Sequence, residues 1–100
     1  MKIRWTHRTL RVRLDDLEFA VLARGEALRE TIAFPGGSWA IEVRTAQESE
    51  FGLRGGVLRV TLSEAELRLL ARGDHDGVER EGQPRLLVER ELMPRHLEGA

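Results

Sequence analysis

The densest cluster of residues that could bind a metal ion or act in acid–base catalysis lies late in the chain. One histidine and three carboxylates stand within six positions: Asp74, His75, Asp76 and Glu79. Carboxylate oxygens and imidazole nitrogens are common ligands of Zn²⁺ and Mg²⁺, with Glu79 as a possible general base. An ordinary solvated turn explains the same residues, because Asp and Gly favour turns. The cluster therefore predicts either a small metal-assisted hydrolase or a turn, and His7 or His96 could complete a metal site.

A second group of residues could bind anions. The first fourteen residues hold five cations and no acid. If residues 2–5 and 10–14 pair as a hairpin, four of these cations share its outer face: Lys2, Arg4, Arg11 and Arg13. Such a face could bind phosphate groups, a small anionic ligand or an acidic protein partner. Nucleic acid is the least favoured of these, because the outer face carries no aromatic residue on which bases could stack.

The competing interpretation is that other strands neutralise these cations. Carboxylates that could do so across neighbouring strands are Glu30, Glu42 and Glu89. We expect this second arrangement, with exposed pairs that contribute little to stability.

Signatures of other chemistry are missing. The chain has no cysteine, which excludes disulfides and thiolate metal sites. It has no Gly-x-Ser-x-Gly motif and no phosphate-binding glycine loop. The sequence therefore implies no cofactor, and it favours a binding protein over an enzyme.

The elements that position these residues are organised by an internal repeat. Residues 10–26 and 58–74 are identical at nine of seventeen positions at a constant offset of 48. Further along, after a slip of one residue, Ile41-Glu42 matches Val88-Glu89. This similarity predicts a duplicated half-domain, residues 1–48 and 49–94, with a loose tail at 95–100.

Each repeat predicts a strand followed by a helix. Leu10, Val12 and Leu14 alternate with arginines, which is typical of a half-buried strand, and residues 58–62 repeat the pattern. Helix-start signals follow in both halves, Asp15 with Glu18 and Ser63 with Glu66. We expect short helices at 15–24 and 63–72, ended by Gly25 and Gly73. Their expected buried faces contain Leu17, Ala20 and Val21 in the first helix, and Ala65 and Leu69 in the second.

The remaining segments predict strands in pairs. Turns are expected at His7-Arg8, Pro35-Gly36-Gly37, Gly55-Gly56 and Gly82-Gln83-Pro84. The sequence thus predicts an α+β fold with eight strands and two helices. It consists of two ββαββ units that form a mostly antiparallel barrel or sandwich about a pseudo-twofold axis, in a single domain of residues 1–100. Leu14/Leu62 and Leu22/Leu70 should then occupy equivalent buried positions.

The repeat also duplicates two arginines, as Arg11/Arg59 and Arg24/Arg72. Near a pseudo-twofold axis such pairs could clamp an anion, because each guanidinium is a rigid fork of donors. Roles in the scaffold, such as complementing a helix dipole, are the favoured interpretation.

Bulk composition places the chain among soluble globular proteins. Hydrophobic residues make up 41%, charged residues 33%, and the formal net charge is −1. No apolar run approaches the roughly 20 residues that span a bilayer, and the first residues lack the apolar core of a signal peptide. We expect a cytoplasmic protein, monomeric or homodimeric, with no membrane partner. Fifteen of the 16 basic residues are arginine and asparagine is absent, which fits either a thermophile or a GC-rich genome.

Three stretches also resemble a family of small bacterial proteins known only as a domain of unknown function. They are Lys2-Ile3-Arg4, Leu10 to Gly25, and Val88 to Leu92. The family's closing strand usually reads Val-Glu-Lys-Asp and is often followed by cysteine; here Arg90-Glu91 keep the charge pattern, and Met93 and Pro94 follow. The resemblance implies a bacterial, cytosolic protein, and it brings no established activity or site. Our first hypothesis is a non-catalytic binding or interaction module with its ligand site where the two halves meet.

Overall fold

The computed structural model describes residues 1–72 and 77–91. This part of the chain contains eight strands and two helices in mostly antiparallel sheets, which confirms the predicted α+β class. The chain divides into two compact units, one of residues 1–19 with 69–100 and one of residues 20–68. Each unit contains one four-stranded sheet.

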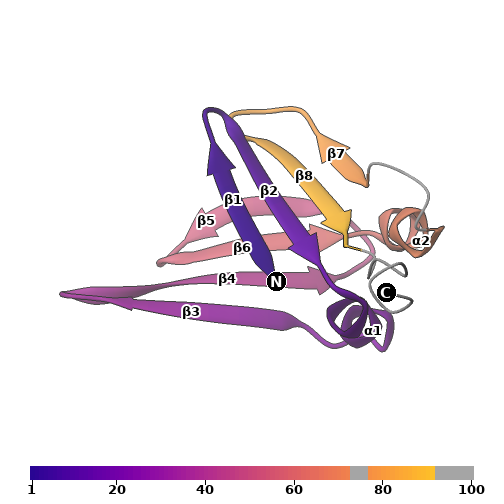
Figure 1. Cartoon of the computed structure of the whole chain (residues 1–100), viewed down its shortest axis with the longest axis horizontal. Helices are drawn as coiled ribbons and strands as arrows, with labels where there is room; N and C mark the ends of the chain where they lie inside the picture. The colour runs from indigo at the N-terminus through magenta and orange to yellow at the C-terminus, as the bar shows by residue number, and fades with distance from the viewer. Residues whose placement is uncertain (73–76, 92–100) are drawn as a thin grey trace, which may run out of the picture. The chain divides into compact units, whose positions relative to one another are not determined.

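The sheet of the first unit joins the beginning of the chain to its end. Its order is β1 (Lys2–Thr6), β2 (Thr9–Leu14), β8 (Arg85–Arg90) and β7 (Val78–Arg80). The outer pairs β1–β2 and β7–β8 are antiparallel hairpins, and the central pair β2–β8 is parallel (Figure 1). The predicted turn at His7-Arg8 joins β1 to β2.

The sheet of the second unit is built from the middle of the chain. Its order is β3 (Leu28–Phe34), β4 (Gly37–Thr45), β6 (Val57–Leu62) and β5 (Glu50–Arg54). Here too the outer pairs are antiparallel hairpins and the central pair β4–β6 is parallel. Pro35-Gly36 joins β3 to β4, with Gly36 at a φ of 91°, and Gly55-Gly56 joins β5 to β6.

The two sheets have the same strand order when strands at equivalent positions of the sequence repeat are matched. If β1 and β2 are matched to β5 and β6, and β7 and β8 to β3 and β4, the first strand order becomes the second. Each sheet therefore takes one hairpin from each half of the sequence, and the halves meet at the parallel pairs. These similar sheets suggest duplication.

The register corrects one detail of the sequence alignment. Val12 pairs with Val88, and its repeat equivalent Val60 pairs with Val43. Val88 is thus equivalent to Val43 rather than to Ile41. The error is two residues, which leaves side-chain direction unchanged because strand side chains alternate with a period of two.

One face of each sheet supplies the core. Leu10, Val12 and Leu14 of β2 are buried, as are Leu86 and Val88 of β8. In the second unit the buried set includes Ile41, Val43, Val60 and Leu62. Trp5 lies on the apolar face as predicted, yet it is 62% exposed because β1 is an edge strand.

Two short helices begin where the capping signals predicted. They are α1 (Asp16–Ala23) and α2 (Glu64–Arg72). The Glu18 amide donates to Asp15 Oδ1 at 2.8 Å, and the Asp15 amide donates to Glu18 Oε1 at 2.9 Å. Ser63 and Glu66 repeat this reciprocal box at 3.2 and 2.9 Å.

The end of α1 also follows the prediction. Gly25, at a φ of 87°, donates to the Leu22 carbonyl at 2.9 Å, and Glu26 donates to the Val21 carbonyl at 3.1 Å. These two bonds form a Schellman motif, which a residue with a side chain adopts at a cost in strain. Gly73, the predicted end of α2, lies outside the described residues.

The predicted buried faces of the helices are wrong at four of their five positions, and the fifth, Val21, is half-buried. Leu17 is 80% exposed and Leu69 37% exposed, and Ala20 and Ala65 are exposed as well. The buried position of each helix is instead the leucine that the repeat keeps, Leu22 or Leu70. Each helix has little more than two turns, so more than one of its faces shows the apolar spacing of a buried face. The spacing alone therefore does not identify which face is buried.

Candidate functional site

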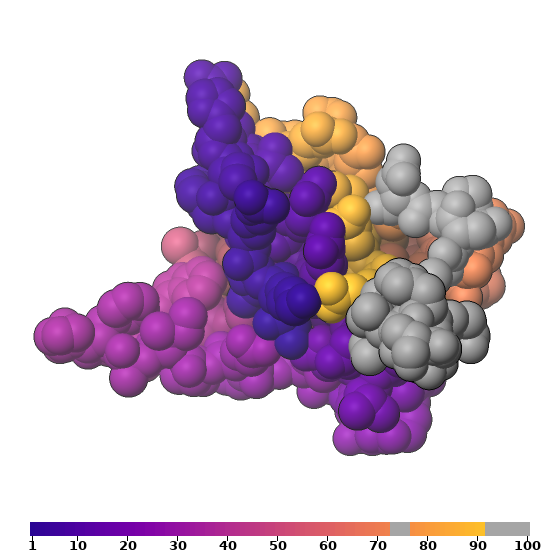
Figure 2. Space-filling model, viewed as in Figure 1, coloured from indigo at the N-terminus to yellow at the C-terminus, as the bar shows by residue number. Residues whose placement is uncertain are grey.

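The predicted basic hairpin forms in the first unit, with its cations on one face. Lys2 pairs with Arg13 across β1 and β2, and Arg4 pairs with Arg11. Since these residues alternate with apolar ones, all four side chains leave the same side of the sheet. We call this surface, consisting of Lys2, Arg4, Arg11 and Arg13, the basic face. The strand β1 that carries its first half lies at the molecular surface, drawn in indigo in Figure 2.

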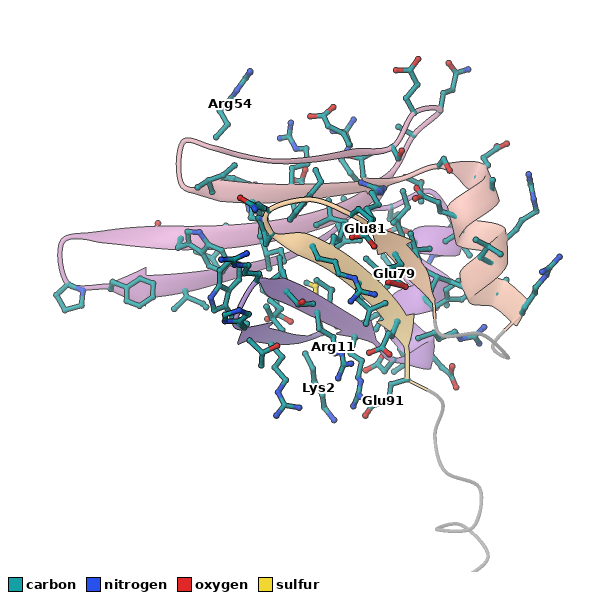
Figure 3. All side chains as sticks on the ribbon, turned by 90° about the horizontal axis from the view of Figure 1, so that it is seen from above. Lys2, Arg11, Arg54, Glu79, Glu81 and Glu91 are labelled. Carbon is teal, nitrogen blue, oxygen red and sulfur yellow. The ribbon has the colours of Figure 1, made fainter. Side chains whose placement is uncertain are left out.

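The neighbouring strand β8 brings two carboxylates to the basic face. Glu89 Oε1 lies 3.2 Å from Arg11 Nε and 3.5 Å from Arg13 Nε. Glu91 Oε1 lies 3.0 Å from Lys2 Nζ and 3.9 Å from Arg13 Nη1. The Glu91 amide donates to the Leu14 carbonyl at 2.6 Å, which continues the parallel pairing beyond β8. Lys2, Arg11 and Glu91 project from the same side of this sheet (Figure 3).

These contacts agree with part of the sequence expectation. Glu89 was among the carboxylates expected to neutralise the hairpin, whereas Glu91 was not. Glu42, another of them, pairs in the second unit with Arg59 at 3.0 Å and with Arg29 at 3.6 Å. The position of Glu91 at the end of β8 would have identified it as a partner of the basic face. That inference requires the parallel pairing of β8 with β2, which the sequence does not show.

Arg4 differs from the other three cations. Among the described residues, no carboxylate forms an ion pair with Arg4 and its side chain makes no hydrogen bond. It lines an open hollow of about 290 Å³ together with Lys2, Ile3, Arg11 and Arg13. Within the described residues, the basic face thus has more cations than carboxylates, and its arginine on the edge strand is unpaired.

The ion pairs on this face are exposed to solvent. The side chains of Lys2 and Arg13 are 70% and 41% exposed, and that of Glu91 is 32% exposed. Pairs of this kind contribute about 0–1 kcal/mol each. Glu89 is the exception: its side chain is only 23% exposed and lies between Arg11 and Arg13.

The predicted metal loop is only partly described. Asp74, His75 and Asp76 lie outside the described residues, so the metal hypothesis stays a prediction for them. Glu79 lies in β7 and forms an ion pair with Arg85, which also lies 3.9 Å from Glu81. Within residues 1–72 and 77–91, no three potential ligands are grouped so that they could hold a metal ion.

Three of the duplicated arginines have a carboxylate partner in their own unit. Arg11 pairs with Glu89, Arg59 with Glu42, and Arg24 with Glu26 at 2.8 Å. Arg72 stands in the last turn of α2, where a cation complements the helix dipole. The contacts in the described chain thus favour the scaffold interpretation of these residues.

Comparison with known proteins places this two-sheet α+β chain in a family. The model of a family of unknown function, DUF7009, matches residues 1–94. The protein therefore belongs to that family, in agreement with the resemblance seen in its sequence. No curated protein and no solved structure matches the chain. Neither described helix is long and apolar enough to cross a membrane.

Proposed function

We propose that this protein is a non-catalytic interaction module that binds an extended acidic segment of a partner protein along β1. The observation that supports this most is the basic face itself, whose unpaired cation Arg4 stands on an edge strand. This site differs from the expected one where the two sequence halves meet, because β2 separates the free edge of β1 from β8.

The edge of β1 offers backbone groups as well as charge. In the described sheet β1 has a single neighbour, β2, so its other edge is available for strand addition. Lys2 and Arg4 are two residues apart on this strand, a spacing of roughly 6.8 Å. An added strand with carboxylates at alternate positions has the same spacing and would place one carboxylate beside each cation.

The opposite face of β1 suits apolar side chains. Ile3 is half-buried, and Trp5, which follows it on the same face, is 62% exposed. A large exposed aromatic residue at a sheet edge is a common anchor of protein interfaces. The partner segment that fits both faces of β1 alternates acidic and apolar residues.

A synthetic peptide of alternating glutamate and valine tests this proposal. We expect it to bind with an affinity that falls as salt rises, and to shift the backbone amide signals of β1 in NMR spectra. Arg4→Gln combined with Arg11→Gln should weaken binding about tenfold or more, since the Arg4 contact alone is worth about 1.5–3 kcal/mol and Arg11→Gln lowers the positive charge of the face further. The melting temperature should hardly change.

The matched control is Arg44→Gln combined with Arg68→Gln, which removes the same charge from exposed positions outside the basic face. This control should bind the peptide like the parent protein. The proposal is wrong if both double variants bind equally well, or if a lysine–valine peptide binds as tightly. Tighter binding of duplex DNA than of the acidic peptide would identify a polyanion binder instead.

A further inference from the structure

A second surface, in the other unit, has features of a small-ligand site. A hollow of about 240 Å³ opens between β5 and β6, with Glu50, Gly52, Leu53, Arg54, Val57 and Arg59 around it. In the register Gly52 stands opposite Arg59, and Arg54 opposite Val57. The hollow exists because Gly52, in the middle of β5, has no side chain.

Nothing in the described chain requires a glycine at this position. Gly52 is not among the glycines with positive φ, so its backbone suits any residue. The pairing of β5 with β6 runs without interruption from Glu50 to Arg54, which excludes a β-bulge. A Cβ atom added at Gly52 would meet no described atom within 4 Å.

A glycine inside a strand lowers stability by roughly 0.5–1 kcal/mol. Where no bulge, turn or close backbone contact accounts for it, a remaining physical reason is the close approach of a ligand. The equivalent position in the other half of the repeat is Arg4, so the scaffold itself accepts a large side chain there.

The charges around the hollow indicate what kind of ligand it suits. The Arg54 side chain has no ion pair or hydrogen bond among the described residues and projects away from its hairpin (Figure 3). Arg59 donates from Nε to Glu42 Oε1 at 3.0 Å, which leaves further guanidinium donors for another acceptor. Arg54 and Arg59 are diagonal neighbours across β5 and β6, a placement that brings Cβ atoms to about 7–8 Å.

We propose that the hollow over Gly52 binds a small ligand through one oxyanion, a phosphate or carboxylate group held between Arg54 and Arg59. Glu50 at the far end of the hollow disfavours a second negative group. A hollow of about 240 Å³ suits a small molecule. This site is independent of the basic face and of the function proposed for it.

NMR titration with inorganic phosphate and, separately, with acetate tests this inference and distinguishes the two oxyanions. We expect saturable shifts of the Gly52 and Arg59 amide signals by at least one of them, with a dissociation constant on the order of 1 mM. Arg54→Gln should weaken binding at least fivefold, whereas Arg68→Gln, which removes an exposed arginine of α2, should leave it unchanged.

The decisive variant is Gly52→Thr. Threonine suits a strand, and a Cβ atom at this position meets no described atom, so the variant should fold and melt at or above the parental temperature. Its side chain should occupy the floor of the hollow and abolish the shifts. If neither oxyanion shifts these signals in the parent protein, or if folded Gly52→Thr binds as the parent does, the site is not there. The double variant Arg4→Gln with Arg11→Gln should bind the oxyanion at the hollow like the parent protein. The two proposals can therefore fail independently of each other.

Discussion

At the scale of single residues, Arg90 is the most highly connected side chain of the first unit. Its Nη1 lies 3.2 Å from the Ala71 carbonyl and 3.5 Å from the Leu70 carbonyl at the end of α2. Its Nε and Nη2 both lie 3.1 Å from Asp16 Oδ1 at the start of α1. The guanidinium also lies 4.3 Å from the centre of the Phe19 ring. Arg90 thus connects the end of β8 to the ends of two helices.

We predict that Arg90→Ala lowers the free energy of unfolding by about 2–3 kcal/mol. The loss combines charge-assisted bonds to helix carbonyls with a cation–π contact. Arg90→Lys should lower the free energy of unfolding less than Arg90→Ala, because lysine keeps the charge. It should still lower it, because lysine lacks the planar fork of donors. Urea denaturation measures both values.

The control for this prediction is Arg24→Ala. Arg24 is 61% exposed and its partner Glu26 is 60% exposed, so this change should cost less than about 0.5 kcal/mol. Equal losses for Arg90→Ala and Arg24→Ala would contradict the anchoring role of Arg90.

At the scale of elements, the two capping boxes determine where the helices begin. Each box satisfies amide groups that the first turn of a helix leaves unpaired. We predict that Asp15→Ala and Ser63→Ala each lower the free energy of unfolding by about 1 kcal/mol. Thermal melts of the single variants measure these losses.

The double variant, Asp15→Ala with Ser63→Ala, shows whether the two caps act independently. Because the capping bonds of each box lie within one helix start, the losses should add to within about 0.5 kcal/mol. Asp15→Ser and Ser63→Asp exchange one good cap for another and serve as controls, with almost no loss expected. A loss as large as that of alanine in these controls would mean that the side chains act in another way.

At the scale of the whole molecule, the two leucines that the repeat keeps in the helices belong to the core. Leu22 and Leu70 are 0% and 2% exposed, although neighbouring leucines in the same helices are not buried. We predict that Leu22→Ala and Leu70→Ala each lower the free energy of unfolding by about 2–5 kcal/mol. Denaturant titration should give much smaller losses for the matched variants Leu17→Ala and Leu69→Ala. The reverse order would support the helix faces that the apolar spacing predicted.

The elements and their boundaries were predictable from the sequence because their signals are local. Alternation identified β2 and β6, reciprocal caps identified both helix starts, and the Pro35-Gly36 turn identified the β3–β4 hairpin. Each of these features depends on a few neighbouring residues, whose backbone preferences are nearly independent of the rest of the chain. For the same reason, the shared outer face of Lys2, Arg4, Arg11 and Arg13 followed from the hairpin register alone.

Tertiary structure alone decided which strands lie together in each sheet, and with them the charge balance of the basic face. The parallel pairing of β2 with β8 joins residues that are far apart in the chain. Hydrophobic alternation predicts which face of a strand is buried, but it does not predict which strand lies beside it. That pairing placed Glu89 and Glu91 beside Arg11, Arg13 and Lys2, whereas Arg4, on the edge strand, has no carboxylate partner in the part of the chain that the structure describes. It also made β1 an edge strand, which explains why Trp5 is exposed on a face that the sequence predicts to be apolar.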